Sequence, residues 1–79
     1  MPAYRELFPT GSRVRICDLP TLIEFQKTWL YHHKLETEQL SFAGREATVT
    51  SVGFYHGGDV LYWLDGIPGV WHEACLTSP

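Results

Sequence analysis

The stretch that decides the fold runs from residue 54 to residue 64 and reads FYHGGDVLYWL. Two apolar runs flank the turn sequence HGGD, in which Gly57 and Gly58 supply the positive φ angles that a tight hairpin requires. The preceding run, residues 47–55, is rich in β-branched side chains, and its inward spacing changes from two to three near Ser51. The stretch therefore predicts a β-hairpin with a bulge in its first strand.

Shorter strands are expected on both sides of this hairpin. The alternation of polar and apolar residues from Arg13 to Cys17 predicts a first strand with Val14 and Ile16 facing inward. A second tight turn at Asp65-Gly66 leads to a short last strand over residues 70–72. The chain thus contains few β elements, spaced along its whole length.

A helix is expected between the first and second strands, over residues 20–35. Pro20 ends the first strand, and Thr21 and Glu24 have the spacing of a capping box at a helix start. The apolar residues of the segment recur every three or four positions, so one face packs onto the body; they are Leu22, Phe25 and Trp29, flanked by Ile23 and Leu30. The polar residues 36–39 are expected to add a further helical turn.

The predicted fold class is mainly β with one inserted helix. Few, highly bent strands avoid bare edges by closing on themselves, so we expect a small SH3-like barrel with the helix between its first and second strands. Residues 1–79 form one domain, because a chain of this length cannot bury two cores. Residues 1–11 are expected to form an N-terminal arm, anchored by Tyr4, Leu7 and Phe8.

Composition narrows the classes of function. With 44% hydrophobic residues and no apolar run near the roughly 18 residues that span a membrane, the chain is expected to be soluble and globular. A net charge of −3 makes nucleic acid an unfavourable partner, and we expect no membrane partner. No signal peptide is visible, so we expect a cytoplasmic location with both cysteines as free thiols.

Four phrases carry a resemblance to a known family. They are residues 11–16 (GSRVRI), 42–45 (FAGR) leading to Val49, Leu61-Tyr62, and residues 71–76 (WHEACL). The chain resembles, over residues 11–76, the barrel domain of the nitrile hydratase β subunit. It departs from that family in the inserted helix and in lacking the C-x-x-C-S-C metal motif, which belongs to the partner α subunit. We therefore expect no nitrile hydration by this chain alone, and the resemblance implies an accessory or partner-binding barrel.

Aromatic side chains are the leading candidates for partner binding. Both faces of the strand 60–64 are apolar, so one face must be covered by something besides the core. In one interpretation the inserted helix covers Leu61 and Trp63. In the other, Trp63, Tyr55 and Trp71 stay partly open as a groove for an extended peptide, with Tyr31 on a second surface at the helix end. The expected partner is a larger protein or a second copy of the chain.

Two alternative functions remain open at the level of sequence. If the first and last strands meet, Cys17, His72 and Cys75 could bind zinc in a metal-dependent regulatory protein; otherwise both cysteines are small core residues and no cofactor is bound. An RNA-associated barrel would rely on Arg13, Arg15 and Arg45. His72-Glu73 lacks the second histidine of H-E-x-x-H, and no nucleophile and base are placed together, so we expect no enzyme.

Overall fold

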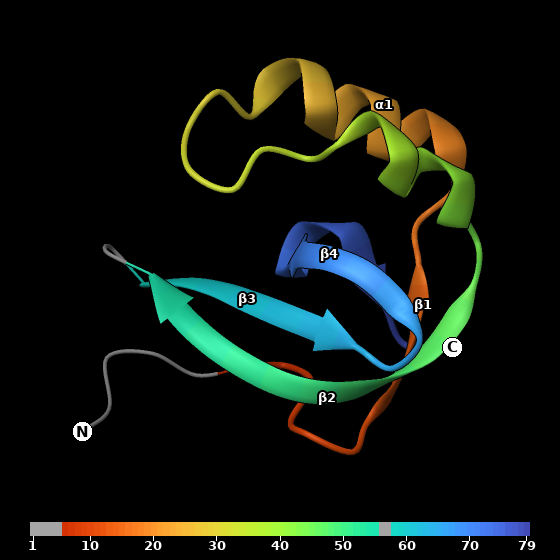
Figure 1. Cartoon of the computed structure of the whole chain (residues 1–79), viewed down its shortest axis with the longest axis vertical. Coiled ribbons are helices and arrows are strands. Elements are labelled where there is room, and N and C mark those ends of the chain that lie inside the picture. Colours follow the sequence, from red (N-terminus) through yellow and green to blue (C-terminus); the bar gives the residue numbers. More distant parts are fainter. Residues whose placement is uncertain (1–5, 56–57) are drawn as a thin grey trace.

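The computed structural model describes residues 6–55 and 58–79 of the chain (Figure 1). The elements in chain order are β1 (Arg13–Ile16), the helix α1 (Leu19–Thr28), the 3₁₀ helix η1 (Thr37–Phe42), β2 (Glu46–Tyr55), β3 (Asp59–Leu64), β4 (Ile67–His72), the 3₁₀ helix η3 (Glu73–Cys75) and β5 (Leu76–Thr77). The prediction of a mainly β class with a helix between the first two strands is confirmed.

The five strands form one antiparallel sheet in the order β4-β3-β2-β1-β5. Strand β2 is shared: its first residues pair with β1, and the rest, from Val49 to Tyr55, pair with β3. The register shifts between Val49 and Ser51, so the predicted bulge is confirmed. The chain end returns to the first strand, because Leu76 of β5 pairs with Ile16 of β1. Figure 1 shows the long, curved β2 running beneath β3 and β4.

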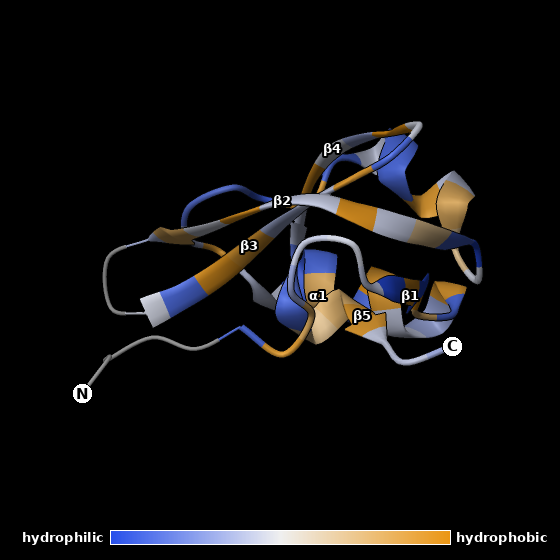
Figure 2. Ribbon diagram, turned by 90° about the horizontal axis from the view of Figure 1, so that it is seen from below, coloured by the Kyte–Doolittle hydropathy of each residue, from blue (hydrophilic) through white to orange (hydrophobic). Residues whose placement is uncertain are grey.

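The core lies on one side of each strand. Along β2 the residues Ala47 and Val49 are buried between exposed or half-buried neighbours, and Figure 2 shows this alternation of hydrophobic and hydrophilic residues. Tyr62 of β3 and Trp71 of β4 face each other as a register pair, and neither has any exposed surface. Together with Val14 and Ile16 of β1, they make the centre of the hydrophobic core.

The helix is shorter than the sequence predicts and has a different cap. Asp18, not Thr21, is the N-cap residue, and its carboxylate accepts a hydrogen bond of 3.0 Å from the Thr21 amide. Hydrogen bonding from Thr21, first from its side chain and then from its amide, lowers the pKa of Asp18. Pro20 lies inside the first turn, where a missing N–H costs nothing. The helix ends at Thr28 instead of near Lys34, because Trp29 leaves the helical conformation.

The segment after the helix is held by one buried amide. The polar stretch around residues 36–39 does form a helical turn, η1, as predicted. The Gln39 side chain accepts from the Glu36 amide at 2.7 Å and donates to the Val70 carbonyl at 3.1 Å. Gln39 is only 2% exposed, so this amide ties η1 to β4 across the interior.

We expect Gly69→Ala to destabilise the domain by about 2 kcal/mol. Gly69 has a φ of +94°, and a Cβ there would lie 2.7 Å from the Gln39 Nε2 atom. Alanine would therefore be strained and would push the buried amide away from both of its partners. Gly11→Ala is the matched control, since Gly11 also has a φ of +94° but open space around its Cβ position. Urea denaturation of both variants would contradict this account if Gly11→Ala cost as much as Gly69→Ala.

The N-terminal arm is described from residue 6 onward, so Tyr4 lies outside the described residues. The Leu7 amide donates to the Tyr62 hydroxyl and to a Glu73 carboxylate oxygen at 3.1 and 3.0 Å. The Phe8 ring packs edge-on against Tyr62 with 5.7 Å between ring centres, while the Leu7 side chain is exposed. Phe8 thus acts as the predicted anchor, whereas Leu7 is held by its backbone. Across residues 6–55 and 58–79, no helix has the length and apolar character needed to cross a membrane.

Candidate functional site

The register of the strands defines an outer face on β2, β3 and β4. Tyr62 and Trp71 point into the core, so Leu61 and His72, which form a neighbouring register pair, point to the opposite side. The same alternation places Asp59 and Trp63 of β3 on this outer face, opposite Tyr55 and Ser51 of β2. The full set on the outer face is Ser51, Gly53, Tyr55, Asp59, Leu61, Trp63 and His72.

The loop that follows α1 packs onto this outer face. The Trp29 indole N–H donates to the His32 carbonyl at 2.6 Å, and His33 adopts a positive φ of 49°, which turns the chain sharply. His32 Nε2 then lies 2.8 Å from a carboxylate oxygen of Asp59. The loop is therefore fastened to the start of β3 by a histidine–carboxylate contact.

Three histidines converge where this loop meets the sheet: His32 and His33 of the loop and His72 of β4. A carboxylate accepts, so the Nε2 atom of His32 carries the hydrogen in its contact with Asp59. The Nδ1 atoms of His32 and His33 lie 2.8 Å apart, which requires one hydrogen between them. When His32 is neutral, its Nδ1 accepts that hydrogen bond from His33. A carbonyl also only accepts, so His72 Nε2 donates to the His33 carbonyl at 2.7 Å.

His72 is only 4% exposed, and its ring lies 5.0 Å and 4.9 Å from the ring centres of Phe25 and Trp29. Burial lowers the pKa of His72 more than any other cause. The hydrogen bond to the His33 carbonyl acts in the opposite direction, and the nearby His32 and His33 rings lower the pKa again. The neutral form of His72 is therefore the form that fits the folded protein.

This burial predicts that the domain loses stability in mild acid. As the pH falls below about 6.5, His72 of the unfolded chain takes up a proton while the folded chain, with its lowered pKa, does not. The free energy of unfolding therefore falls as the pH falls through this window. Above the window, the stabilising contribution of His72 is complete. Urea denaturation at a series of pH values should show a flatter pH dependence for His72→Gln than for the unsubstituted chain. Equal slopes would contradict the assignment.

Exposed aromatic rings continue from the histidines in both directions. Tyr55 stacks on His32 with 3.8 Å between ring centres, and Tyr31 packs edge-on against Trp29 at 4.9 Å. The Trp63 ring covers Gly53, since a Cβ on Gly53 would lie 3.0 Å from it, and Tyr55 is the next residue of β2 on this face. We name Trp63, Tyr55, His32, Trp29 and Tyr31 the aromatic strip.

Of the four aromatic residues that the sequence predicts for partner binding, three are exposed and one is buried. Tyr31, Tyr55 and Trp63 are 69%, 38% and 37% exposed and belong to the aromatic strip. Leu61 is buried, so the face is covered at Leu61 but left partly open at Trp63. Trp71 is fully buried, and the prediction that it lies on a binding surface is wrong. Its register pairing with Tyr62 turns its side chain into the core.

The residues proposed as zinc ligands do not converge. Cys17 and Cys75 are neighbours, because the Cys17 amide donates to the Cys75 carbonyl at 2.9 Å, and both are free thiols. The His72 ring, however, packs against Trp29 and donates to the His33 carbonyl. Within residues 6–55 and 58–79, no group of three or more histidine, cysteine or acidic side chains is arranged to hold a metal ion.

The arginines proposed for an RNA site are engaged with other side chains. Arg15 lies 2.6 Å and Arg13 3.6 Å from carboxylate oxygens of Glu46. The hydrogen bond and charge of Arg15 are the main reasons why the pKa of Glu46 is lowered. Arg45 lies over the Phe42 ring at 5.6 Å. These contacts offset or occupy the positive charges on which an RNA-binding patch would depend.

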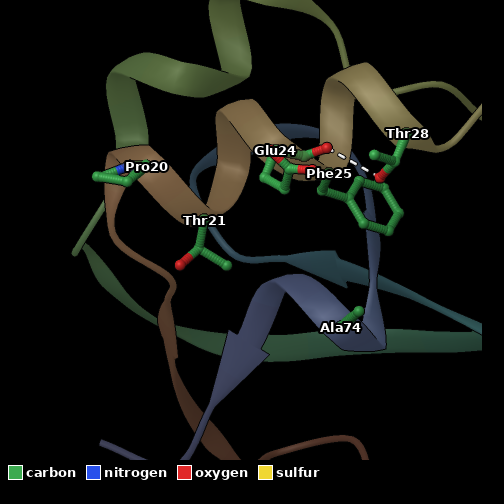
Figure 3. Close-up of a pocket in the computed structure, with 6 residues that line it drawn as sticks. All are labelled: Pro20, Thr21, Glu24, Phe25, Thr28 and Ala74. Carbon is green, nitrogen blue, oxygen red and sulfur yellow. Dashed lines mark hydrogen bonds between the residues drawn. The ribbon is translucent and has the colours of Figure 1, made fainter.

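Two adjoining hollows lie beside α1, and the smaller of them reaches the aromatic strip at Trp29. The larger, of about 440 Å³, lies between α1 and η3; Figure 3 shows Thr21, Glu24 and Phe25 of the helix facing Ala74 across it. The smaller, of about 160 Å³, is bounded by Trp29, Asp59, Glu73 and their neighbours. Phe25 and Ala74 line both hollows.

The convergence of Trp29, His32 and Asp59 was not visible in the sequence, which placed Trp29 on a helix and Asp59 in a hairpin turn. Comparison of the chain with models of protein families, with curated proteins and with solved structures found no match.

Proposed function

We propose that this chain is a non-catalytic protein-interaction module built on an SH3-like barrel, with α1 inserted between the first two strands. Two features support the barrel. Strand β2 is shared between the two halves of the sheet, and β5 returns to β1 after the 3₁₀ turn η3. Both are what a small, strongly bent sheet requires to close on itself. The resemblance to the nitrile hydratase β-subunit barrel points to the same class of accessory domain.

The exposure of the aromatic strip is the observation that carries the proposed function. Tyr31, Tyr55 and Trp63 keep 69%, 38% and 37% of their surface exposed although they pack against a folded face. Aromatic side chains dominate the energetics of protein interfaces, because a rigid ring offers a large area at small entropic cost. The stacking of Tyr55 on His32 reduces that cost further, since the ring is already ordered before binding.

The proposed partner is an extended segment of a larger protein. The rings of the strip follow one another along the outer face, from Trp63 past Tyr55 to the loop at Tyr31. An extended peptide fits such a shape, since its alternate side chains lie on one side and reach successive rings.

The proposal is tested by selecting peptides from a displayed random library on the full chain. Trp63→Ala and Tyr55→Ala are each expected to weaken the selected peptides by about tenfold or more. Ile23→Ala is the matched control, because Ile23 is 38% exposed on α1 but lies outside the strip. Circular dichroism would establish that all three variants fold.

Failure to enrich any peptide would contradict the proposal, as would equal losses for Ile23→Ala and Trp63→Ala. Sedimentation over a range of protein concentrations tests the remaining partner. Self-association that Trp63→Ala abolishes would replace the peptide by a second copy of the chain.

A further inference from the structure

The two hollows adjoin each other, because Phe25 and Ala74 line both of them. One part runs between α1 and η3, past Thr21 and Glu24, as Figure 3 shows. The other ends at Trp29 and Asp59, where the aromatic strip begins. We name this feature the acidic groove.

Charge sets the chemistry of this groove. Its lining includes three acidic residues, Glu24, Asp59 and Glu73, and none of the described residues that line it is Lys or Arg. The carboxylates of Asp59 and Glu73 are held in place: Asp59 by His32, and Glu73 by the Tyr62 hydroxyl and the Leu7 amide. Both carboxylates are therefore fixed in position before a cation binds, so binding does not have to order them.

The walls between these carboxylates are aromatic. Phe25 of α1 and Trp29, the residue that follows the helix, lie stacked with 5.5 Å between ring centres and 12° between ring planes. Both rings are half-buried, so part of each is open to the groove. A guanidinium group is planar, stacks on aromatic rings and pairs with carboxylates through two hydrogen bonds, and so matches both features.

We propose that the acidic groove binds an extended basic peptide, with an arginine side chain placed between the aromatic walls and the carboxylates of Asp59 and Glu73. The inference rests on the proposed function, since it names the chemistry of the partner segment. Because Trp29 lines the groove and also belongs to the strip, one peptide can contact both surfaces, with basic residues in the groove and other residues over Tyr55 and Trp63.

The test uses three synthetic peptides of equal length, in which arginine, lysine or glutamine alternates with alanine. Binding is followed by fluorescence anisotropy with the full chain at low and at high salt. The arginine peptide is expected to bind about tenfold or more tightly than the glutamine peptide, as hydrogen bonds to charged groups predict. Added salt should reduce this difference.

Glu24→Lys reverses one charge in the groove, and Glu38→Lys is its matched control, because Glu38 is also an exposed glutamate but lies on η1 outside the groove. Glu24→Lys is expected to weaken the arginine peptide by about tenfold, and Glu38→Lys to leave it nearly unchanged. Asp59→Asn should weaken it as well.

The outcomes separate this inference from the proposed function. If library peptides depend on Trp63 but the arginine and glutamine peptides bind alike, the module stands and the acidic groove is overturned. If the arginine peptide responds to Glu24→Lys but Trp63→Ala affects no peptide, the groove stands and the aromatic strip fails. Equal losses for Glu24→Lys and Glu38→Lys, or a polyamine that binds as tightly as the arginine peptide, would overturn the basic-peptide assignment.

Discussion

Replacing Trp71 by alanine is expected to cost about 3–5 kcal/mol of unfolding free energy, the range for deleting a buried aromatic ring. Trp71 has no exposed surface and pairs across the sheet with the equally buried Tyr62. A domain of 79 residues has a small core, and the free energy of unfolding of such domains is about 5–15 kcal/mol. The variant should therefore be largely unfolded or melt far below the unsubstituted chain in thermal or urea denaturation.

Two further tryptophan variants make this test specific. Trp71→Phe should cost much less, because it keeps a ring in the core and removes the Trp71 indole N–H, which is buried without a hydrogen-bond partner among the described residues. Trp63→Ala should leave the domain folded, since Trp63 is 37% exposed. If Trp63→Ala unfolded the protein while Trp71→Ala did not, the assignment of core and surface would be reversed.

The Cys75 thiol is expected to be almost inert to alkylation while the domain is folded. Burial is the main cause that raises the pKa of Cys75 to about 12, and the neighbouring Cys17 raises it further. Because only the thiolate reacts, a rise from the ordinary value of 9.0 lowers the reactive fraction near neutral pH by about a thousandfold. Steric protection of the fully buried side chain adds to this.

Alkylation by iodoacetamide, followed by mass spectrometry, tests this prediction on the Cys17→Ser variant, in which Cys75 is the one remaining thiol. The folded chain should react at least about a hundredfold more slowly than the same chain in urea. The reciprocal variant, Cys75→Ser, reports Cys17, which is half-buried and whose pKa is also raised, mainly by burial. Cys75 reacting as fast as Cys17 in the folded state would contradict the buried position of η3.

The β-hairpin and its bulge could be predicted because local signals agree with the final contacts. Gly58 has a positive φ of 92°, as the predicted turn requires, while His56 and Gly57 of that turn lie outside the described residues. The change of spacing near Ser51 appears as a register shift. The end of α1 could not be predicted in this way. Its apolar period continues through Trp29 and Leu30, but the Trp29 indole bonds to the His32 carbonyl and turns the chain. Tertiary contacts here override the pattern.

The candidate site was predicted in part. Tyr55 and Trp63 are exposed, as expected where both faces of strand 60–64 are apolar, and Tyr31 is exposed in the loop after α1, where the sequence placed it at a helix end. Trp71 was misplaced, because a three-residue strand gives too short a pattern to show which side faces the core. His32 precedes η1 in the chain and Asp59 follows β2, so their contact joins residues that are far apart in the sequence. No local pattern predicts such a contact.

The central claim is that partners bind along the aromatic strip. The most direct measurement is amide chemical-shift mapping by NMR, in which the labelled full chain is titrated with a peptide selected from the library. We predict that the largest shifts fall on Tyr31, His32, Tyr55 and Trp63. Shifts confined to β1 and β5, with these amides unmoved, would contradict the claim.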